Sequence, residues 1–340
     1  MTTSLSRRAG LLAGATAILI LAAALVPRGR LLAEEPPSYA ALDILALVLS
    51  LAAALPLAWL AWTRTVQPPR VRTWEWVAIL LALVTAISLT ATMAVSPASF
   101  NLLVSEDGLV EWSSAWILLA SALILGISGA FRRSLHWIER VFRLGVAAAI
   151  AVVGFEEASW FQRVLGYPTP DWLIDRNQQG EFNLHNLATN LSENIYYVGS
   201  AFAVIGARAL LCLPQGSPQV RRIILHIPGG AALVAIMLSC AFNWDMWRIV
   251  FIEAAFGLVV AIAGVEAASA WLRRQRAEAV LYASVLVATI AIQLAFLIYG
   301  AAMQRAWDAT EARELFIAAG LGLYCLQLAL PARTEVRSSP

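Results

Sequence analysis

The chain has 340 residues, of which 60% are hydrophobic and 14% are charged, and its mean hydropathy is +0.72. A soluble domain carries about 25% charged residues, and a soluble fold of this size needs more polar surface than this composition supplies. The net charge of +2 and the lack of a long basic run exclude nucleic acid as a partner. The composition therefore predicts an integral membrane protein.

Ten segments are apolar enough, over about 20 residues, to cross a hydrocarbon core about 30 Å thick. They predict an all-α fold, a polytopic transmembrane helix bundle of about ten spans. The first segment follows Arg7 and Arg8 as a signal peptide would, but its long apolar run and the lack of an A-x-A site favour a retained helix. In chain order the segments are 10–27, 39–62, 74–95, 111–131, 141–158, 190–213, 224–242, 247–271, 279–301 and 314–331.

The arginines predict the orientation of these spans, because the cytoplasmic flanks of membrane helices are enriched in positive charge. All 24 basic residues are arginines. With the N-terminus inside, 17 of them fall in inner segments and the other 7 in outer segments. We therefore expect a multi-pass protein of the bacterial inner (plasma) membrane, surrounded by membrane lipids, with both termini in the cytoplasm.

The chain is predicted to form a single integral membrane domain, 1–340, without an appended soluble domain. Within it we distinguish three N-terminal spans, a core that carries the polar motifs, two C-terminal spans and a disordered polar tail. These parts are residues 1–95, residues 96–272 with an outward loop at 159–189, residues 273–331 and residues 332–340.

Three carboxylates fall close to or inside predicted hydrocarbon: Glu156, Glu157 and Glu253. An ionised carboxylate at that depth costs several kcal/mol unless it is paired or hydrated, so it marks a functional cavity by default. The alternative is a structural ion pair between helices, with Arg163 or Arg248 as the partner. We favour a functional cavity for Glu156 and Glu157, and leave both interpretations open for Glu253.

The outer connection from 159 to 188 is long for a loop without structure, and such loops tend to be functional. It mixes aromatic and aliphatic residues with Pro168 and Pro170. This pattern predicts short interfacial helices, broken at the prolines, that lie on the membrane surface. They would form either a lid over a polar pocket or an inert packing element.

Three motifs on the outward side resemble those of a group of bacterial multi-pass membrane proteins with no established activity. They are E-D-G…E at Glu106 to Glu111, E-E-x-S-W-x-Q-R at Glu156 to Arg163, and N-x-Q-G-E-x-N-x-H-N at Asn177 to Asn186. The resemblance covers about residues 100–260 and points to sites rather than to a reaction. Phe155 and Phe161 stand where small residues, often Gly, are expected in that group.

The sequence excludes one kind of metal site and leaves another as a candidate. A three-His zinc site is excluded, because His136 and His226 fall on the inner side and His185 on the outer side of a 30 Å core. A divalent metal held mainly by carboxylates is a candidate, since Glu181 and His185 share one face of a helical turn. Its further ligands would come from Glu106, Asp107, Glu111, Glu156 or Glu157. The spacing of intramembrane glutamate proteases does not fit.

We expect an outward-facing carboxylate and histidine pocket, and three functions fit it. The first is an enzyme acting on a lipid or lipid-linked substrate, with close carboxylates sharing a proton for acid–base work. The second is a transporter or proton-coupled permease, although few polar groups are expected in the inner halves of the spans. The third is a membrane scaffold or assembly subunit. The catalytic candidates are Glu156, Glu157 and His185, and the substrate-binding candidates are Gln162, Arg163, Asn177, Gln179, Asn183 and Asn186.

Overall fold

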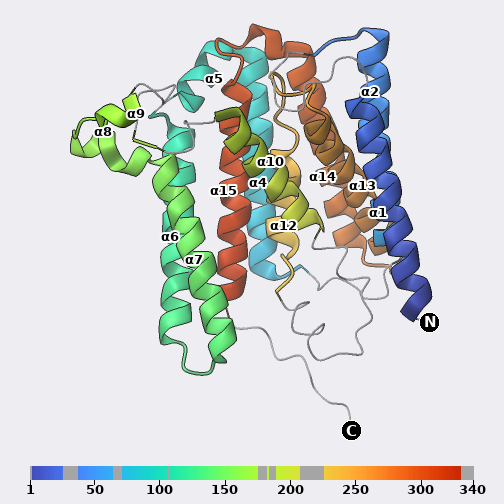
Figure 1. Ribbon diagram of the computed structural model, residues 1–340, viewed down its shortest axis with the longest axis horizontal. Coiled ribbons are helices and arrows are strands. Elements are labelled where there is room, and N and C mark those ends of the chain that lie inside the picture. The colour runs from blue at the N-terminus through green and yellow to red at the C-terminus, as the bar shows by residue number, and fades with distance from the viewer. Residues whose placement is uncertain are drawn as a thin grey trace.

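The computed structural model describes residues 2–25, 37–63, 71–105, 107–174, 182–183, 189–206 and 226–330, and its regular elements in these ranges are helices. Their order gives an all-α bundle, as predicted (Figure 1). The elements are α1 (Thr2–Ala24), α2 (Ala41–Ala52), α3 (Leu55–Trp62), α4 (Thr73–Val95), α5 (Pro97–Val104), α6 (Leu109–Phe131), α7 (Trp137–Glu157), η1 (Ser159–Phe161), α8 (Gln162–Leu165), α9 (Asp171–Ile174), α10 (Thr189–Gly206), α12 (Gly230–Ser239), α13 (Val250–Leu272), α14 (Arg276–Tyr299), η4 (Gly300–Ala302) and α15 (Asp308–Ala329).

Six helical stretches within the described residues are long and apolar enough to cross a membrane. The chain is therefore a multi-pass membrane protein. Each of the ten predicted segments overlaps a helix, but α1, α7, α10 and α12 do not meet the same criteria of length and hydropathy, so the count of ten stays a prediction. The six stretches are Ala41–Trp62, Thr73–Val95, Pro97–Phe131, Val250–Leu272, Arg276–Ala302 and Asp308–Ala329.

Two packed clusters hold the helices together, and α15 belongs to both. The larger cluster joins α4, α10, α12, α13, α14 and α15. The smaller one joins the hairpin of α6 and α7 to one side of α15 through residues such as Leu118, Ile150 and Cys325. Figure 1 shows this hairpin at the edge of the bundle, with α8 and α9 projecting from its upper end. Helix α15 thus makes most of the contact between the hairpin and the main body, and the beginning of α6 adds a smaller contact with α5.

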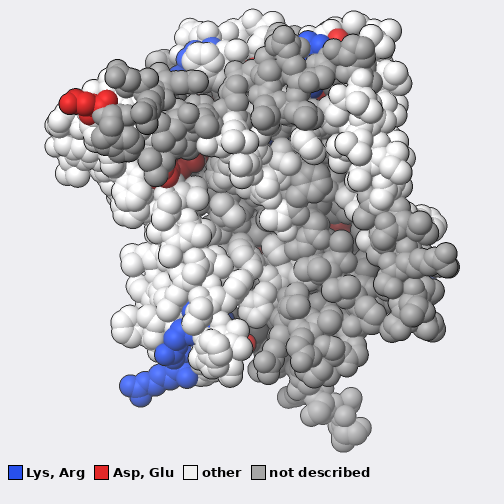
Figure 2. Space-filling model, in the orientation of Figure 1, with Lys and Arg blue, Asp and Glu red and all other residues white. Residues whose placement is uncertain are grey.

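The bundle has two distinct ends. The beginning of α1 and the end of α15 lie at the lower end in Figure 1, whereas α6 and α15 begin at the upper end, where α7 finishes. Basic side chains gather at the lower end of the α6–α7 hairpin in Figure 2. The carboxylates at the beginnings of α6 and α15 and at the end of α7 therefore lie at the same, upper end. The sequence predicted a shared side for those of α6 and α7.

Helix α12 crosses only part of the bundle. Its ten residues span about 15 Å, and residues 241–249 continue without an α-helix in a buried or half-buried path. Non-helical backbone at membrane depth occurs only where protein buries it or where it lines a cavity. At the other end of α12 the backbone N–H of Gly229 donates to Gln327, and a Cβ on Gly229 would lie 2.5 Å from a Glu75 oxygen, so a larger residue would have to displace the end of the Glu75 side chain.

Candidate functional site: a carboxylate cluster at the upper end of the bundle

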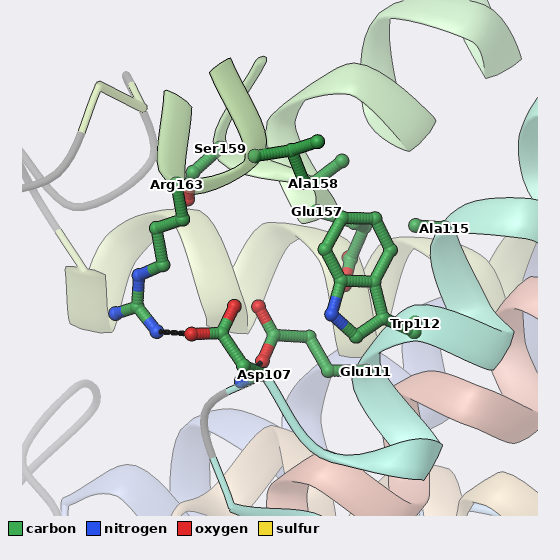
Figure 3. A pocket seen from close by; sticks show the side chains of 9 residues that line it. Asp107, Glu111, Trp112, Ala115, Glu157, Ala158, Ser159 and Arg163 are labelled. Atoms are coloured by element: carbon green, nitrogen blue, oxygen red, sulfur yellow. Dashed lines mark hydrogen bonds and ion pairs between the residues drawn. The ribbon is translucent and has the colours of Figure 1, made fainter. Parts of the chain in front are cut away.

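A small pocket lies where α6 begins and α7 ends, and Figure 3 shows its side chains. Its volume of about 10 Å³ is comparable to the space that one water molecule requires. Two helices and the turn after α7 supply the walls. The lining residues are Asp107, Glu111, Trp112, Ala115, Glu157, Ala158, Ser159, Arg163 and Val164.

The α6 side of the pocket is shaped by a tight turn before the helix. Asp107 has a φ of 58°, and a Cβ on Gly108 would lie 2.4 Å from the carbonyl oxygen of Ser105. The Glu111 carboxylate accepts the backbone N–H of Asp107 at 2.6 Å, and a negative charge in the first turn suits the positive end of the helix dipole. Asp107 also forms an ion pair with Arg163, which links this turn to α8 (Figure 3).

The α7 side of the pocket ends in a left-handed turn of three residues. Ser159, Trp160 and Phe161 have φ values of 43°, 52° and 60°, a region that costs about 1–2 kcal/mol for each residue with a Cβ. The Trp160 indole N–H donates to Glu156 at 2.7 Å. The Phe161 ring packs 6.0 Å from Trp112. Side-chain contacts with α6 and α7 thus hold a backbone conformation that is unfavourable by itself.

Behind the pocket, carboxylates from three helices face one another. Glu157 at the end of α7 interacts electrostatically with Glu314, Glu111 and Glu156. Glu311 interacts with Glu314, Glu111 and Glu157. We call Glu111, Glu157, Glu311 and Glu314 the carboxylate cluster. Like charges within electrostatic range of one another disfavour the charged form of their neighbours.

Two tyrosines of α10 line the inner side of the cluster. Tyr197 donates its hydroxyl to Glu314 at 2.6 Å. The Tyr196 hydroxyl is buried without a hydrogen-bond partner among the described residues, and it lies within electrostatic range of Glu157 and Glu314. Arg305 is the cation that interacts with Glu311, but its guanidinium already binds Asp308 at 2.7 Å. Within the described residues, the cluster therefore gathers four carboxylates, and Arg305 is a cation that interacts with one of them.

A chain of polar groups continues from the cluster into the bundle. Tyr197, whose hydroxyl donates to Glu314, also has its ring centre 4.8 Å from the guanidinium carbon of Arg313. Arg313 is 1% exposed, interacts electrostatically with the Cys240 side chain, and keeps Nε and Nη1 without hydrogen-bond partners among the described residues. The Cys240 carbonyl accepts from Asn243 at 2.7 Å. This path leads to the non-helical segment that follows α12.

The same path ends on α14. Asn243 donates to Gln293 at 2.7 Å, and Gln293 donates back to the Asn243 carbonyl at 2.9 Å. Thr289 lies one turn away on the same helix, fully buried, with its hydroxyl lacking a partner in the described chain. Polar groups thus extend beyond the outward pocket, but they lie toward the outward ends of the predicted spans, so the expectation of few polar groups in the inner halves stays a prediction.

The structure brings together part of the predicted site. Asp107, Glu111, Glu157 and Arg163 line one pocket, and Glu156 lies beside it. Gln162 and Asn183 instead hold the loop: Gln162 bonds Thr169 at 2.6 Å and Phe182 at 2.5 Å, and Asn183 bonds Ser159 at 3.2 Å. The remaining predicted residues lie outside the described parts of the chain: Glu106, Asn177, Gln179, Glu181, His185 and Asn186.

Sequence reasoning missed the contribution of α15. The run Glu311-Ala312-Arg313-Glu314 places three charges in four residues next to an apolar span, which is a signal of a functional group at membrane depth. The predicted span began at 314, so Glu311 and Arg313 were assigned to the outer loop. The helix begins at Asp308 instead, and it carries these charges into the bundle.

The metal site stays a prediction. In the described ranges no three His, Cys, Asp or Glu side chains are grouped so that they could hold a metal ion. Two of the predicted metal ligands, Glu106 and Glu181, and the nearby His185 lie outside those ranges. Comparison with protein-family models, curated proteins and solved structures gives no match to this chain.

Proposed function

We propose that this protein is a proton-coupled permease of the bacterial inner membrane, in which the carboxylate cluster exchanges protons with the outer side. The observation that carries the proposal is the series of neighbouring polar groups from Glu157 and Glu314 through Tyr197 and Arg313 to the break after α12. Ionisable groups inside a membrane bundle that face one another mark ion and proton pathways.

The size of the pocket favours protons over a larger substrate. Sites for small molecules occupy about 300–1,000 Å³, whereas the space among the described residues at the cluster is about 10 Å³. A water molecule fits there and a lipid head group does not. Water beside carboxylates provides the hydrogen bonds along which a proton moves, and Asp107 with Arg163 would guard the entrance (Figure 3).

The break after α12 supports transport as well. Transporters place their binding sites near the bilayer midplane, where discontinuous helices expose backbone groups. Here a ten-residue helix ends at Ser239, and the following buried segment carries Asn243 and Asp245. Arg313 near this end of α12 matches the negative pole of the helix dipole. The transported solute would bind at this break, and the cluster would supply the coupling proton.

The topology completes the proposal. Ten passes, with the carboxylate cluster outside and both termini inside, agree with the arginine distribution and with the basic side chains at the lower end of the α6–α7 hairpin (Figure 2). Cysteine labelling of intact cells tests this arrangement. A cysteine in the α6–α7 turn should be protected from an impermeant thiol reagent, and one at Tyr167 should react.

A second candidate, an enzyme for a lipid or lipid-linked substrate, is favoured by the projecting α8 and α9. Val164, Leu165 and Ile174 on these helices are exposed by 64%, 72% and 48%, as expected for elements that touch lipid. A substrate at this rim would meet Glu157 directly. The two candidates differ in requirement, because an enzyme has no need of Arg313 and Gln293 deeper in the bundle.

Proteoliposomes with a trapped pH dye test the permease. A panel of small carboxylates, amines and sugars is added outside, and proton movement is recorded for each solute. We expect at least one class to drive proton entry, and Glu157→Gln to reduce the rate by at least about tenfold, since a proton-exchanging group contributes factors of that order. Glu139→Gln, at the opposite end of α7, is the matched control. Equal rates in wild type, Glu157→Gln and empty vesicles for every solute would overturn the proposal.

A further inference from the structure

An apolar groove runs along the outside of the bundle between α4 and α14. Its volume is about 670 Å³, and small side chains form its floor, among them Ala91 on α4 and Ala283, Ala288 and Ala291 on α14. Large side chains rise at its rims, with Ile87 exposed by 55% and Val287 by 66%. Both flanking helices are candidate membrane spans, so the groove lies at the depth of lipid hydrocarbon.

An arginine lies at the N-terminal end of the α14 wall of the groove. Residues three or four apart share one helix face, and the exposed stripe Val280, Ala283, Val287 and Ala291 continues downward to Arg276. Arg276 is the first residue of α14 and is exposed. Glu278 in the same turn lies about 200° around the helix from Arg276, on a different face.

The beginning of α14 also offers backbone donors. Its N-cap residue Gln275 makes no side-chain capping hydrogen bond, and uncapped N–H groups at a helix N-terminus bind phosphate. The Arg276 guanidinium lies 3.6 Å from the centre of the Trp271 ring. Tryptophan and arginine together are typical of the interface between head groups and hydrocarbon, so this end of the groove is at head-group level.

We propose that the groove binds one anionic phospholipid, with its phosphate at Arg276 and the N-terminus of α14 and an acyl chain between α4 and α14. The length of the groove selects this occupant. From Val280 to Ile292 the helix rises about 18 Å, close to the depth of one leaflet and well short of the 30 Å over which a partner helix would pack.

Lipid retention tests the head-group part of the proposal. The delipidated full-length protein is equilibrated in mixed micelles with phosphatidylglycerol or phosphatidylcholine of identical acyl chains, and bound lipids are counted by native mass spectrometry. We expect wild type to prefer phosphatidylglycerol and Arg276→Gln to lower this preference about fivefold, since one arginine near a membrane surface contributes about 1 kcal/mol. Arg133→Gln, an exposed arginine in the α6–α7 turn, should leave the preference unchanged.

A second pair of variants tests the acyl-chain part. Ala291→Leu fills the groove and should reduce the retention of both lipids, whereas the same substitution at Ala148, exposed halfway along α7 and away from the groove, should not. Size-exclusion profiles confirm that each variant is folded. An equal preference in wild type, equal effects of the two arginine variants, or unchanged retention in Ala291→Leu would each overturn the proposal. A disulfide-linked dimer through Ala291→Cys would do so too, by assigning the groove to a second copy.

Discussion

Two groups of acidic residues, one fully buried and one half-buried, lie within two turns of each other on α15, and the described residues compensate them in different ways. Asp308 is fully buried and accepts from the Arg305 guanidinium at 2.7 Å and from the Asn101 amide at 3.2 Å. Glu311 and Glu314 instead interact with Glu111 and with each other's carboxylates. One group is a closed network of matched charges, and the other is a cluster of like charges.

This difference separates acidic residues that stabilise the fold from acidic residues that are candidates for a function. A carboxylate whose oxygens are all satisfied by cations and amides links parts of the chain, here α5, the segment after η4, and α15. The pair of Arg248 and Asp43 at 2.7 Å does the same between α2 and the segment before α13. Carboxylates that face carboxylates bring repulsion instead of cohesion, so a folded protein that retains them uses them for something other than stability.

Breaking the matched network should have the largest effect on stability. Asp308→Ala leaves the Arg305 guanidinium and the Asn101 amide without their acceptor, and removal of one partner of a buried pair costs about 3–5 kcal/mol. We expect the free energy of unfolding in mixed micelles to fall by about 3 kcal/mol. Glu278→Ala, in the first turn of α14 and only half-buried, is the control and should change it by less than about 0.5 kcal/mol. A loss below about 1 kcal/mol for Asp308→Ala would mean that the network is not cohesive.

Sequence alone predicted the helices well and the site only in part, for a physical reason. Hydropathy over about 20 residues reports burial in a bilayer, and every predicted segment overlaps a helix. Charged residues lower the mean hydropathy of a sequence window, so the last predicted span begins at residue 314. The helix itself begins at Asp308 and includes both Glu311 and Arg313. Whether a buried charge meets a cation or another carboxylate depends on the packing of distant helices, which no local pattern encodes.

The left-handed turn includes a position at which the chain departs from the group that it resembles. Small residues, often Gly, were expected at position 161 from that resemblance, and Phe161 has a φ of 60°, a conformation that favours glycine. The aromatic ring there contacts Trp112, Trp116 and Phe155. Ring packing by Phe161 thus offsets the backbone strain of a positive φ, which glycine would avoid.

A matched pair of substitutions at this turn should have an intermediate effect. Phe161→Ala and Phe161→Gly both remove the ring contacts, but only glycine relieves the backbone. We expect Phe161→Gly to be more stable than Phe161→Ala by about 1 kcal/mol, measured as the difference in unfolding free energy. An advantage for alanine would show that the turn relaxes out of the left-handed region once the ring is gone, and that packing alone imposes it.

Changing a member of the carboxylate cluster should have the smallest effect on stability and a large one on function. Glu314→Gln keeps the shape of the side chain and its hydrogen bond with Tyr197, and it removes one like charge from Glu157 and Glu311. The free energy of unfolding should therefore stay within about 0.5 kcal/mol of wild type or rise. Proton entry into dye-loaded proteoliposomes should nevertheless fall as far as it does for Glu157→Gln, because the shared proton loses one of its sites. A destabilisation comparable to that of Asp308→Ala would show that Glu314 stabilises the fold as Asp308 does. The two groups on α15 would then differ only in how much they stabilise the fold.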